Sequence, residues 1–330
     1  MSVPRITIKD VAREAGVSVA TVSFVMNDKG NLPEATRLRV REVCDRLGYK
    51  TNRRAANLRT GKSRTIGFII PELRNEGWVT QWYELIGQAI LGVSQAASAR
   101  GYAVVIVPPN SPDLMLEFGL DAVALNDSQI DDPDITRAHS LGIPIVTQDR
   151  PHDSRISVHL DTGYAAMTTA ALEALRERGA RHVALLTEPG GATSNTTQVA
   201  AFLTWCETHG YTPTVVRGAH DRSDLVDRVN EILGSGADAL YSFYGEGEAI
   251  VAQLREQGYD VPHDFQVIAL RAAPAGVQHK DELSTTTYHP ELYTGMAIGT
   301  TLDVVEGKLE APQTVHVPWR LELAETTRNV

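Results

Sequence analysis

The residues whose types and spacing suggest a chemical function lie within the first 60 positions. Residues 6–27 contain two short helical patterns joined by a turn at residues 16–18. The arginine-rich stretch NRRAANL follows 25 residues later, at residues 52–58. This arrangement predicts a helix-turn-helix DNA-binding head followed by a hinge.

Charge is distributed unevenly along the chain. Residues 1–64 hold 14 of the 31 Lys and Arg but only 6 of the 41 Asp and Glu, a net charge of +8. The remaining 17 basic and 35 acidic residues give residues 65–330 a net charge of −18. An acidic protein of net charge −10 is ordinarily a poor partner for a polyanion. Because the positive charge is concentrated at one end, that end is the expected nucleic-acid contact.

The head is expected to contain three helices. Thr7 and Asp10 have the spacing of a capping box, which predicts the start of the first helix, and Gly16 permits the turn that ends it. A second helix should begin at Ser18, and a third should open at Pro33 and end at Gly48. Helical periodicity predicts which side chains are buried: Ile8, Val11, Ala12, Ala15, Val22, Val25, Met26, Val40, Val43 and Leu47. The outer side of the second helix would carry Val19, Ala20, Ser23, Phe24 and Asn27.

Beyond residue 62 the pattern changes to alternating strands and helices, which predicts parallel sheets with crossover helices in two lobes. Strands are expected at residues 65–70, 103–107, 122–125, 143–147, 182–187, 214–217, 239–243 and 267–270. Helices are expected at residues 85–100, 163–178, 199–208, 225–233 and 248–257. Ligands of such sheets bind at the carboxyl ends of strands, so a cleft between the lobes is the expected small-molecule site.

Signals of catalysis and metal binding are missing from the sequence. No glycine-rich phosphate loop follows the first strand, Ser194 is not in a nucleophile elbow, and the ten histidines lack ligand spacing. We therefore expect neither an enzyme nor a cofactor or metal. Cys44 and Cys206 are expected to be buried apolar residues. Because the N-terminus lacks an apolar signal region and no segment approaches a membrane span, we expect a cytoplasmic protein rather than a secreted binding protein.

The sequence resembles the LacI/GalR family of bacterial transcriptional regulators. The resemblance rests on T-I-K-D-V-A-x-x-A-G-V-S-x-x-T-V-S at residues 7–23, T-R-x-R-V at 36–40, L-G-Y at 47–49 and N-x-x-A-x-x-L at 52–58. It implies an all-α helix-turn-helix head joined to an α/β two-lobed, periplasmic-binding-protein-like core. The head would span residues 1–50, the hinge helix and linker 51–64, and the effector-binding and dimerisation core 65–330. The N-lobe would comprise about 65–160 and 291–318, and the C-lobe about 161–290 and 319–330.

The resemblance also assigns DNA contacts. The second helix would enter the major groove, where Val19, Ala20 and Phe24 would read base edges. These apolar side chains either contact thymine methyl groups or simply permit close approach, and Phe24 departs from the polar residue commoner in the family. The family's phosphate contacts would fall on Thr7, Ser18, Thr21, Ser23, Asn27, Asn31 and Thr36.

The hinge stretch would fold into a helix when paired with its dimer mate on DNA. Asn52 and Ala55 match the family's hinge pattern, and Leu58 matches the side chain that wedges between base steps in the minor groove. Thr51 and Ala56 replace the family's usual Pro and Arg. A simple solvated linker is the alternative.

The implied effector site departs further from the family. Asp149 is retained as an acceptor for a ligand hydroxyl, whereas Gln198 stands in place of an Arg. Phe243 and Tyr244 replace an Asn-Asp pair, Arg271 replaces an Asp, and Trp78 lies on a segment that would line the same cleft. These replacements favour an effector with an anionic group or a flat ring. Alternatively, the aromatic residues pack in the interior and the site is vestigial.

The sequence therefore predicts a dimeric, sequence-specific DNA-binding regulator, most simply a repressor, controlled by a small molecule in the interlobe cleft. Its DNA partner would be a near-palindromic double-stranded operator. Two alternatives remain open: an effector-independent regulator with a vestigial sensor site, and a small-molecule-binding protein with no role on DNA. The sequence does not decide whether the effector releases the operator or promotes binding to it.

Overall fold

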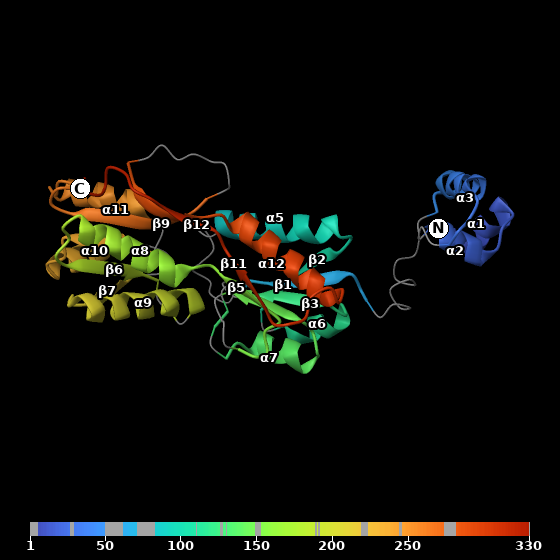
Figure 1. The fold of residues 1–330 in the computed structure, drawn as a ribbon, viewed down its shortest axis with the longest axis horizontal. Coiled ribbons are helices and arrows are strands. Elements are labelled where there is room, and N and C mark those ends of the chain that lie inside the picture. The colour runs from blue at the N-terminus through green and yellow to red at the C-terminus, as the bar shows by residue number, and fades with distance from the viewer. Residues whose placement is uncertain are drawn as a thin grey trace. The chain divides into compact units, whose positions relative to one another are not determined.

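The structure is a computed structural model that divides into two compact units, Met1–Ser63 and Arg64–Val330. It describes residues 6–26, 30–49, 62–70, 83–109, 111–125, 128–129, 131–148, 153–188, 190, 192–218, 224–243, 246–273 and 282–329. The first unit is the helical head and the second is an α/β core (Figure 1).

The head consists of helices α1 (Ile8–Ala15), α2 (Val19–Met26) and α3 (Glu34–Leu47). Gly16 and Gly48 end α1 and α3 in the left-handed conformation, with φ values of 63° and 64°. A residue with a Cβ would be strained at either position. The expected inner faces meet in one cluster: Val11, Ala12, Ala15, Val22, Val25, Val40, Val43 and Cys44. The three-helix prediction is confirmed, with Ile8, Met26 and Leu47 half-buried at the edge of this cluster.

The core contains two six-stranded sheets. The first has the order β11-β5-β4-β3-β1-β2 and its neighbouring strands are parallel throughout. Its strands are β1 (Thr65–Ile69), β2 (Ala103–Val107), β3 (Ala122–Leu125), β4 (Ile145–Gln148), β5 (Val158–Asp161) and β11 (Gln313–His316). The second sheet has the order β12-β10-β9-β8-β6-β7, in which the edge strand β12 alone runs antiparallel. It is built from β6 (Val183–Thr187), β7 (Thr214–Arg217), β8 (Ala239–Ser242), β9 (Gln266–Ala272), β10 (Ser284–Tyr288) and β12 (Trp319–Glu322).

Helices cover both faces of each sheet, as the alternating pattern predicts. Helices α5 (Tyr83–Ala99) and α12 (Pro290–Val305) share one buried cluster with the first sheet, and α6 (Pro112–Glu117) and α7 (Pro133–Ser140) share another. In the second sheet, α8 (Tyr164–Glu177) and α9 (Thr193–His209) pack on one face, and α10 (Leu225–Gly234) and α11 (Gly247–Glu256) on the other. The chain passes between the sheets after β5, after β10 and again between β11 and β12.

The predicted elements are present with differences at their ends, whereas the sequence prediction did not include α6, α7, α12, β5, β10, β11 and β12. Strand β4 lies two residues further along at its start than expected, and α9 begins at Thr193 rather than at residue 199. The early start of α9 matters because its first turn is buried and polar: Thr193, Ser194 and Asn195 are each less than 10% exposed. Apolar periodicity does not detect such a turn, which is fixed by contacts distant in sequence.

Candidate nucleic-acid interface and effector site

The start of α1 is fixed by the predicted capping box. The Thr7 amide donates to Asp10 Oδ2 at 3.0 Å, and the Thr7 hydroxyl donates to the same oxygen at 2.6 Å. The hydrogen bond from the Thr7 hydroxyl holds the pKa of Asp10 below its ordinary value, and the adjacent Arg13 acts in the same direction. The carboxylate therefore stays charged to a lower pH than an ordinary Asp does. Thr7 is half of this cap as well as a predicted phosphate contact.

The turn between α1 and α2 places Ser18 at the start of α2. Its Oγ accepts a hydrogen bond from the Thr21 amide at 3.0 Å and lies 2.9 Å from Thr21 Oγ1. This cap satisfies one of the amide groups that the first turn of a helix leaves unpaired. The N-terminus of α2 is therefore well defined, and Ser18 itself is exposed.

The residues of α2 that are predicted to read bases are apolar and accessible. Val19 is 41% exposed and Phe24 is 47% exposed, and Ala20 is exposed beside them. Thr21 and Ser23 are half-buried, whereas Val22 and Val25 on the opposite side are buried in the head cluster. The predicted base-reading residues thus share one accessible face.

Two further predicted DNA contacts lie in the described part of the head: Asn31 is exposed and Thr36 is half-buried on the first turn of α3. The remaining ones, Asn27, Asn52, Ala55 and Leu58, lie outside the described residues. Their roles stay predictions.

In the core, Phe243 packs in the interior. It follows β8 directly, is 4% exposed, and its ring meets the ring of Tyr164 edge-on at a centroid separation of 5.2 Å. Phe243, Leu270 and Tyr288 come from strand ends of the second sheet, yet they belong to the same buried cluster as α5 and α12. The contacts of the Phe243 ring therefore agree with the alternative stated from the sequence, in which the aromatic residues pack in the interior.

Arg271 is paired with an acid. Its Nη2 donates to Glu248 Oε1 at 2.6 Å, and the two side chains are 13% and 63% exposed. A guanidinium near a cleft can be compensated by a ligand anion or by a neighbouring acid. The second of these is present.

Gln198 on α9 is completely buried. Its Nε2 donates to the Ser194 carbonyl at 3.4 Å, and its Oε1 has no hydrogen-bond partner among the described residues. Burying such an acceptor without a partner is energetically costly. The other predicted effector contacts, Trp78, Asp149 and Tyr244, lie outside the described residues.

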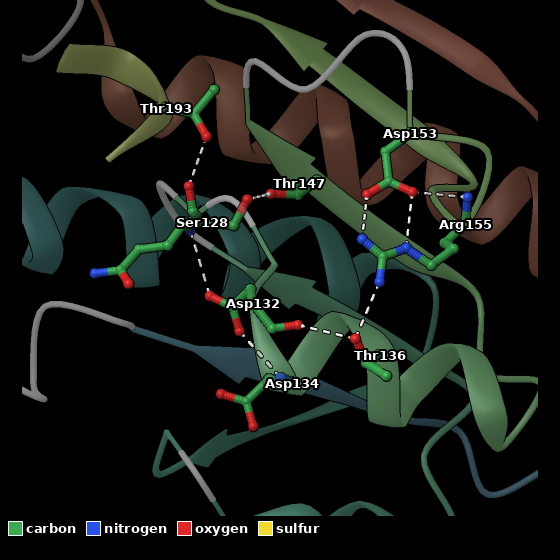
Figure 2. Close-up of polar contacts among 9 residues, drawn as sticks. Ser128, Asp132, Asp134, Thr136, Thr147, Asp153, Arg155 and Thr193 are labelled. Atoms are coloured by element: carbon green, nitrogen blue, oxygen red, sulfur yellow. Dashed lines mark hydrogen bonds and ion pairs between the residues drawn. The ribbon is translucent and has the colours of Figure 1, made fainter. Parts of the chain in front are cut away.

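A polar contact that the sequence did not predict joins the two lobes (Figure 2). The Thr193 hydroxyl and amide both donate to the Ser128 carbonyl, at 2.6 and 3.3 Å. The Ser128 hydroxyl in turn accepts from Thr147 Oγ1 at 2.8 Å. Thr193 opens α9, Thr147 lies on β4, and Ser128 follows β3. The sequence gives only a weak indication of this contact: a Ser that follows a buried strand and a Thr at the start of a helix.

Close to this contact, a small pocket is formed at the carboxyl ends of β1, β3 and β4. Phe68, Leu125 and Tyr293 give it apolar walls, and Thr147 and Gln148 contribute polar groups. The Gln148 side chain donates to the Thr162 hydroxyl and the Tyr164 hydroxyl, both at 2.9 Å. The pocket thus adjoins the chain crossings between the lobes.

Comparison with known proteins identifies both units. Residues 7–52 match the family model of bacterial regulatory proteins of the lacI family, and residues 172–327 match a periplasmic-binding-protein-like domain. The HTH-type transcriptional regulator PtxS of Pseudomonas putida is 32% identical over 282 residues, which cover 81% of this chain and 79% of that protein. The chain belongs to the lacI family. It is a DNA-binding transcriptional regulator with a helix-turn-helix head and a periplasmic-binding-protein-like core.

Other members of the family align over nearly the whole chain. The catabolite control protein A of Priestia megaterium is 21% identical over 98% of this chain and 99% of its own. The crystal structure of the lac repressor dimer, bound to operator and an anti-inducer, superposes with a TM-score of 0.80 at 20% identity, covering 98% of this chain and 100% of that one. These relatives are regulators rather than enzymes. None of the described helices is long and apolar enough to cross a membrane.

Proposed function

We propose that this lacI-family regulator is a dimeric, cytoplasmic repressor that binds a near-palindromic operator through α2. The observation that carries the proposal is the accessible outer side of α2, whose start is fixed by Ser18. This helix lies within residues 1–64, which have a net charge of +8. Two copies related by a two-fold axis would present two such helices to successive half-sites. The lac repressor structure, in which that protein is a dimer bound to operator, supports this arrangement by analogy.

The test compares the full chain with residues 64–330, which form a compact unit of their own. Both are titrated with a duplex selected by the full chain from a random pool, and binding is followed by fluorescence anisotropy. The full chain should bind as a dimer and residues 64–330 should not bind. Operator binding by residues 64–330 alone would contradict the assignment of the head.

We further propose that the core binds a small effector carrying an acidic group, at the carboxyl edge of the second sheet. Arg271 supports this because it lies near the carboxyl end of β9 and because its partner Glu248 is largely exposed. A ligand carboxylate or phosphate that replaces Glu248 would leave the guanidinium paired, so the exchange costs little. The unpaired Oε1 of Gln198 would accept a hydrogen bond from a ligand hydroxyl or amide.

A thermal-shift screen over hexoses, organic acids and nucleosides provides the ligand, because a compound that binds only the folded state raises its melting temperature. Calorimetry then tests the residue. Arg271→Ala should abolish binding of an acidic ligand, whereas Glu248→Gln should strengthen it by releasing the guanidinium. Arg320→Ala is the matched control, since Arg320 also pairs with an acid, Glu322, on β12. Tight binding of a neutral hexose that survives Arg271→Ala would refute the proposal.

The second candidate is an effector-independent regulator with a vestigial site. It is favoured by the buried ring of Phe243 and by the existing Arg271–Glu248 pair. If no compound in the screen shifts the melting temperature while operator binding is retained, this candidate replaces the first. The direction of the effector response follows from measuring operator affinity with and without the ligand.

A further inference from the structure

The three exposed residues of α2 that are predicted to read bases are all apolar, although the half-buried Ser23 lies on the same side of the helix. Ala20 and Phe24 are four residues apart and therefore adjacent on the helix surface, whereas Val19 lies at the edge of this side, beyond Ser23. All three are exposed, and Ala20 and Phe24 lie on the side of α2 opposite the buried Val22 and Val25. We refer to Val19, Ala20 and Phe24 as the apolar face of α2.

Phe24 is supported by the chain that follows α2. Gly30 has a φ of 73°, and a Cβ at this residue would lie 3.5 Å from Phe24 Cδ2, which places the glycine backbone directly against the ring. Arg37 Nη2 donates to the Gly30 carbonyl at 2.7 Å and ties this segment to α3. One side of the ring is thus held by the head, and 47% of the residue remains exposed.

The chemistry of the apolar face restricts what it recognises. Val, Ala and Phe side chains have no hydrogen-bond donor or acceptor, so they cannot form the paired contacts that identify guanine or adenine in the major groove. The one apolar feature that a base pair presents there is the C5-methyl group of thymine. An apolar surface buried against cytosine or guanine edges would instead leave polar atoms without partners, which is unfavourable.

From this geometry we propose that the apolar face of α2 selects operator half-sites by the C5-methyl groups of thymines, with the Phe24 ring as its main contact. The ligand class is therefore duplex DNA with 5-methylpyrimidines at the bases facing α2. This inference rests on the proposed operator binding and adds to it the kind of base that is recognised.

The experiment needs no protein variant in its first arm. The full chain selects duplexes from a random pool, and each thymine of the selected half-site is then replaced by uracil, which removes only the methyl group. At one or more positions in each half-site we expect affinity to fall about fourfold per methyl, equivalent to the burial of one CH₂ group at about 0.8 kcal/mol. In a second set of duplexes, each of these thymines is replaced by cytosine. Using 5-methylcytosine instead of cytosine at the same position should restore most of the lost affinity.

The second arm assigns the effect to Phe24. In Phe24→Ala the penalty for uracil should disappear at one position and persist at the others. In Phe24→Arg the selected base at that position should change from thymine to guanine, because Arg pairs with guanine O6 and N7. Leu38→Ala is the control: Leu38 is an equally exposed apolar residue of the head, at 52%, but lies on α3. Its uracil penalties should match those of the unmodified chain.

The outcomes separate the two proposals. If no sequence is enriched from the pool, operator binding itself fails. If a sequence is enriched but no uracil substitution weakens binding, or if the unmodified chain requires guanine at the bases that Phe24 affects, methyl recognition is refuted while operator binding stands. If replacing thymine by uracil lowers the affinity of Phe24→Ala as much as that of the unmodified chain, other residues recognise the methyl group and the proposed role of the ring is wrong.

Discussion

At the scale of single residues, short-range hydrogen bonds determine where the two DNA-facing helices begin. Thr7 and Asp10 define the start of α1, and Ser18 defines the start of α2. Each interaction joins residues three positions apart, so it forms as soon as the local backbone does. Thr7 and Ser18 are also predicted phosphate contacts. A substitution there consequently affects the fold of the head as well as its DNA affinity.

Replacing Ser18 by Ala removes the acceptor for the Thr21 amide. We expect the head to lose about 1 kcal/mol of unfolding free energy, the usual cost of deleting a helix cap. Hydrogen exchange of the α2 amides in the full chain measures the change. Ser18→Asp keeps an acceptor at the same position and should retain most of the protection while weakening DNA binding. Equal loss in both variants would show that the hydrogen bond does not stabilise α2.

At the scale of elements, the most demanding contact in the core is the close approach of α5 and α12 (Figure 1). A Cβ at Gly92 on α5 would lie 2.2 Å from Thr294 Oγ1 and 2.3 Å from the Glu291 carbonyl on α12. These distances are well inside van der Waals contact, so the two helices can be this close only because residue 92 has no side chain. The pair forms the layer that covers one face of the first sheet.

The variant Gly92→Ala should therefore destabilise the core by about 1–3 kcal/mol or more, because the backbone of α12 must move. Gly87→Ala on the same helix is the matched control, since a Cβ there meets nothing within 4 Å. That substitution should be neutral or stabilising by about 0.5–1 kcal/mol, the helix-propensity difference between Gly and Ala. Urea unfolding of the full chain distinguishes the two, and similar values for both would argue against close helix packing.

At the scale of the whole molecule, charge separates the two units. The first 64 residues carry a net charge of +8 and the rest −18. The acidic core repels DNA, so attraction to the phosphate backbone must come from the head. This separation also explains how a protein with a net charge of −10 can act on DNA.

Operator affinity should consequently depend steeply on salt. If the dimer makes about six to ten phosphate contacts, affinity should fall about 10³-fold or more between about 50 and 200 mM salt. Replacing one head arginine that contacts phosphate should reduce the slope of log affinity against log salt by about one, without changing the preferred sequence. Anisotropy titrations at several salt concentrations measure both, and a flat salt dependence would exclude phosphate contacts as the main source of affinity.

The sequence by itself determined the features that depend on near neighbours. Caps, glycine turns and helical periodicity placed α1, α2 and α3, and alternation of strands and helices placed most of the core. Residues facing in or out of α2 were predicted because a regular helix fixes their direction. The burial of Cys44 and Cys206 was predicted as well, and burial raises the pKa of the Cys206 thiol to about 11, which keeps it protonated.

Tertiary structure alone decided the contacts of the effector site. Phe243 is buried because Tyr164 packs against it, and Arg271 is neutralised because Glu248 on α11 reaches it. The Thr193–Ser128 contact joins residues 65 positions apart. Helix α12 was not predicted because apolar side chains such as Leu292 and Met296 are exposed outside its buried stripe, which obscures the helical period in the sequence. Each of these contacts joins residues that are distant in sequence. A local sequence pattern therefore cannot predict whether such a side chain faces a cleft or is buried.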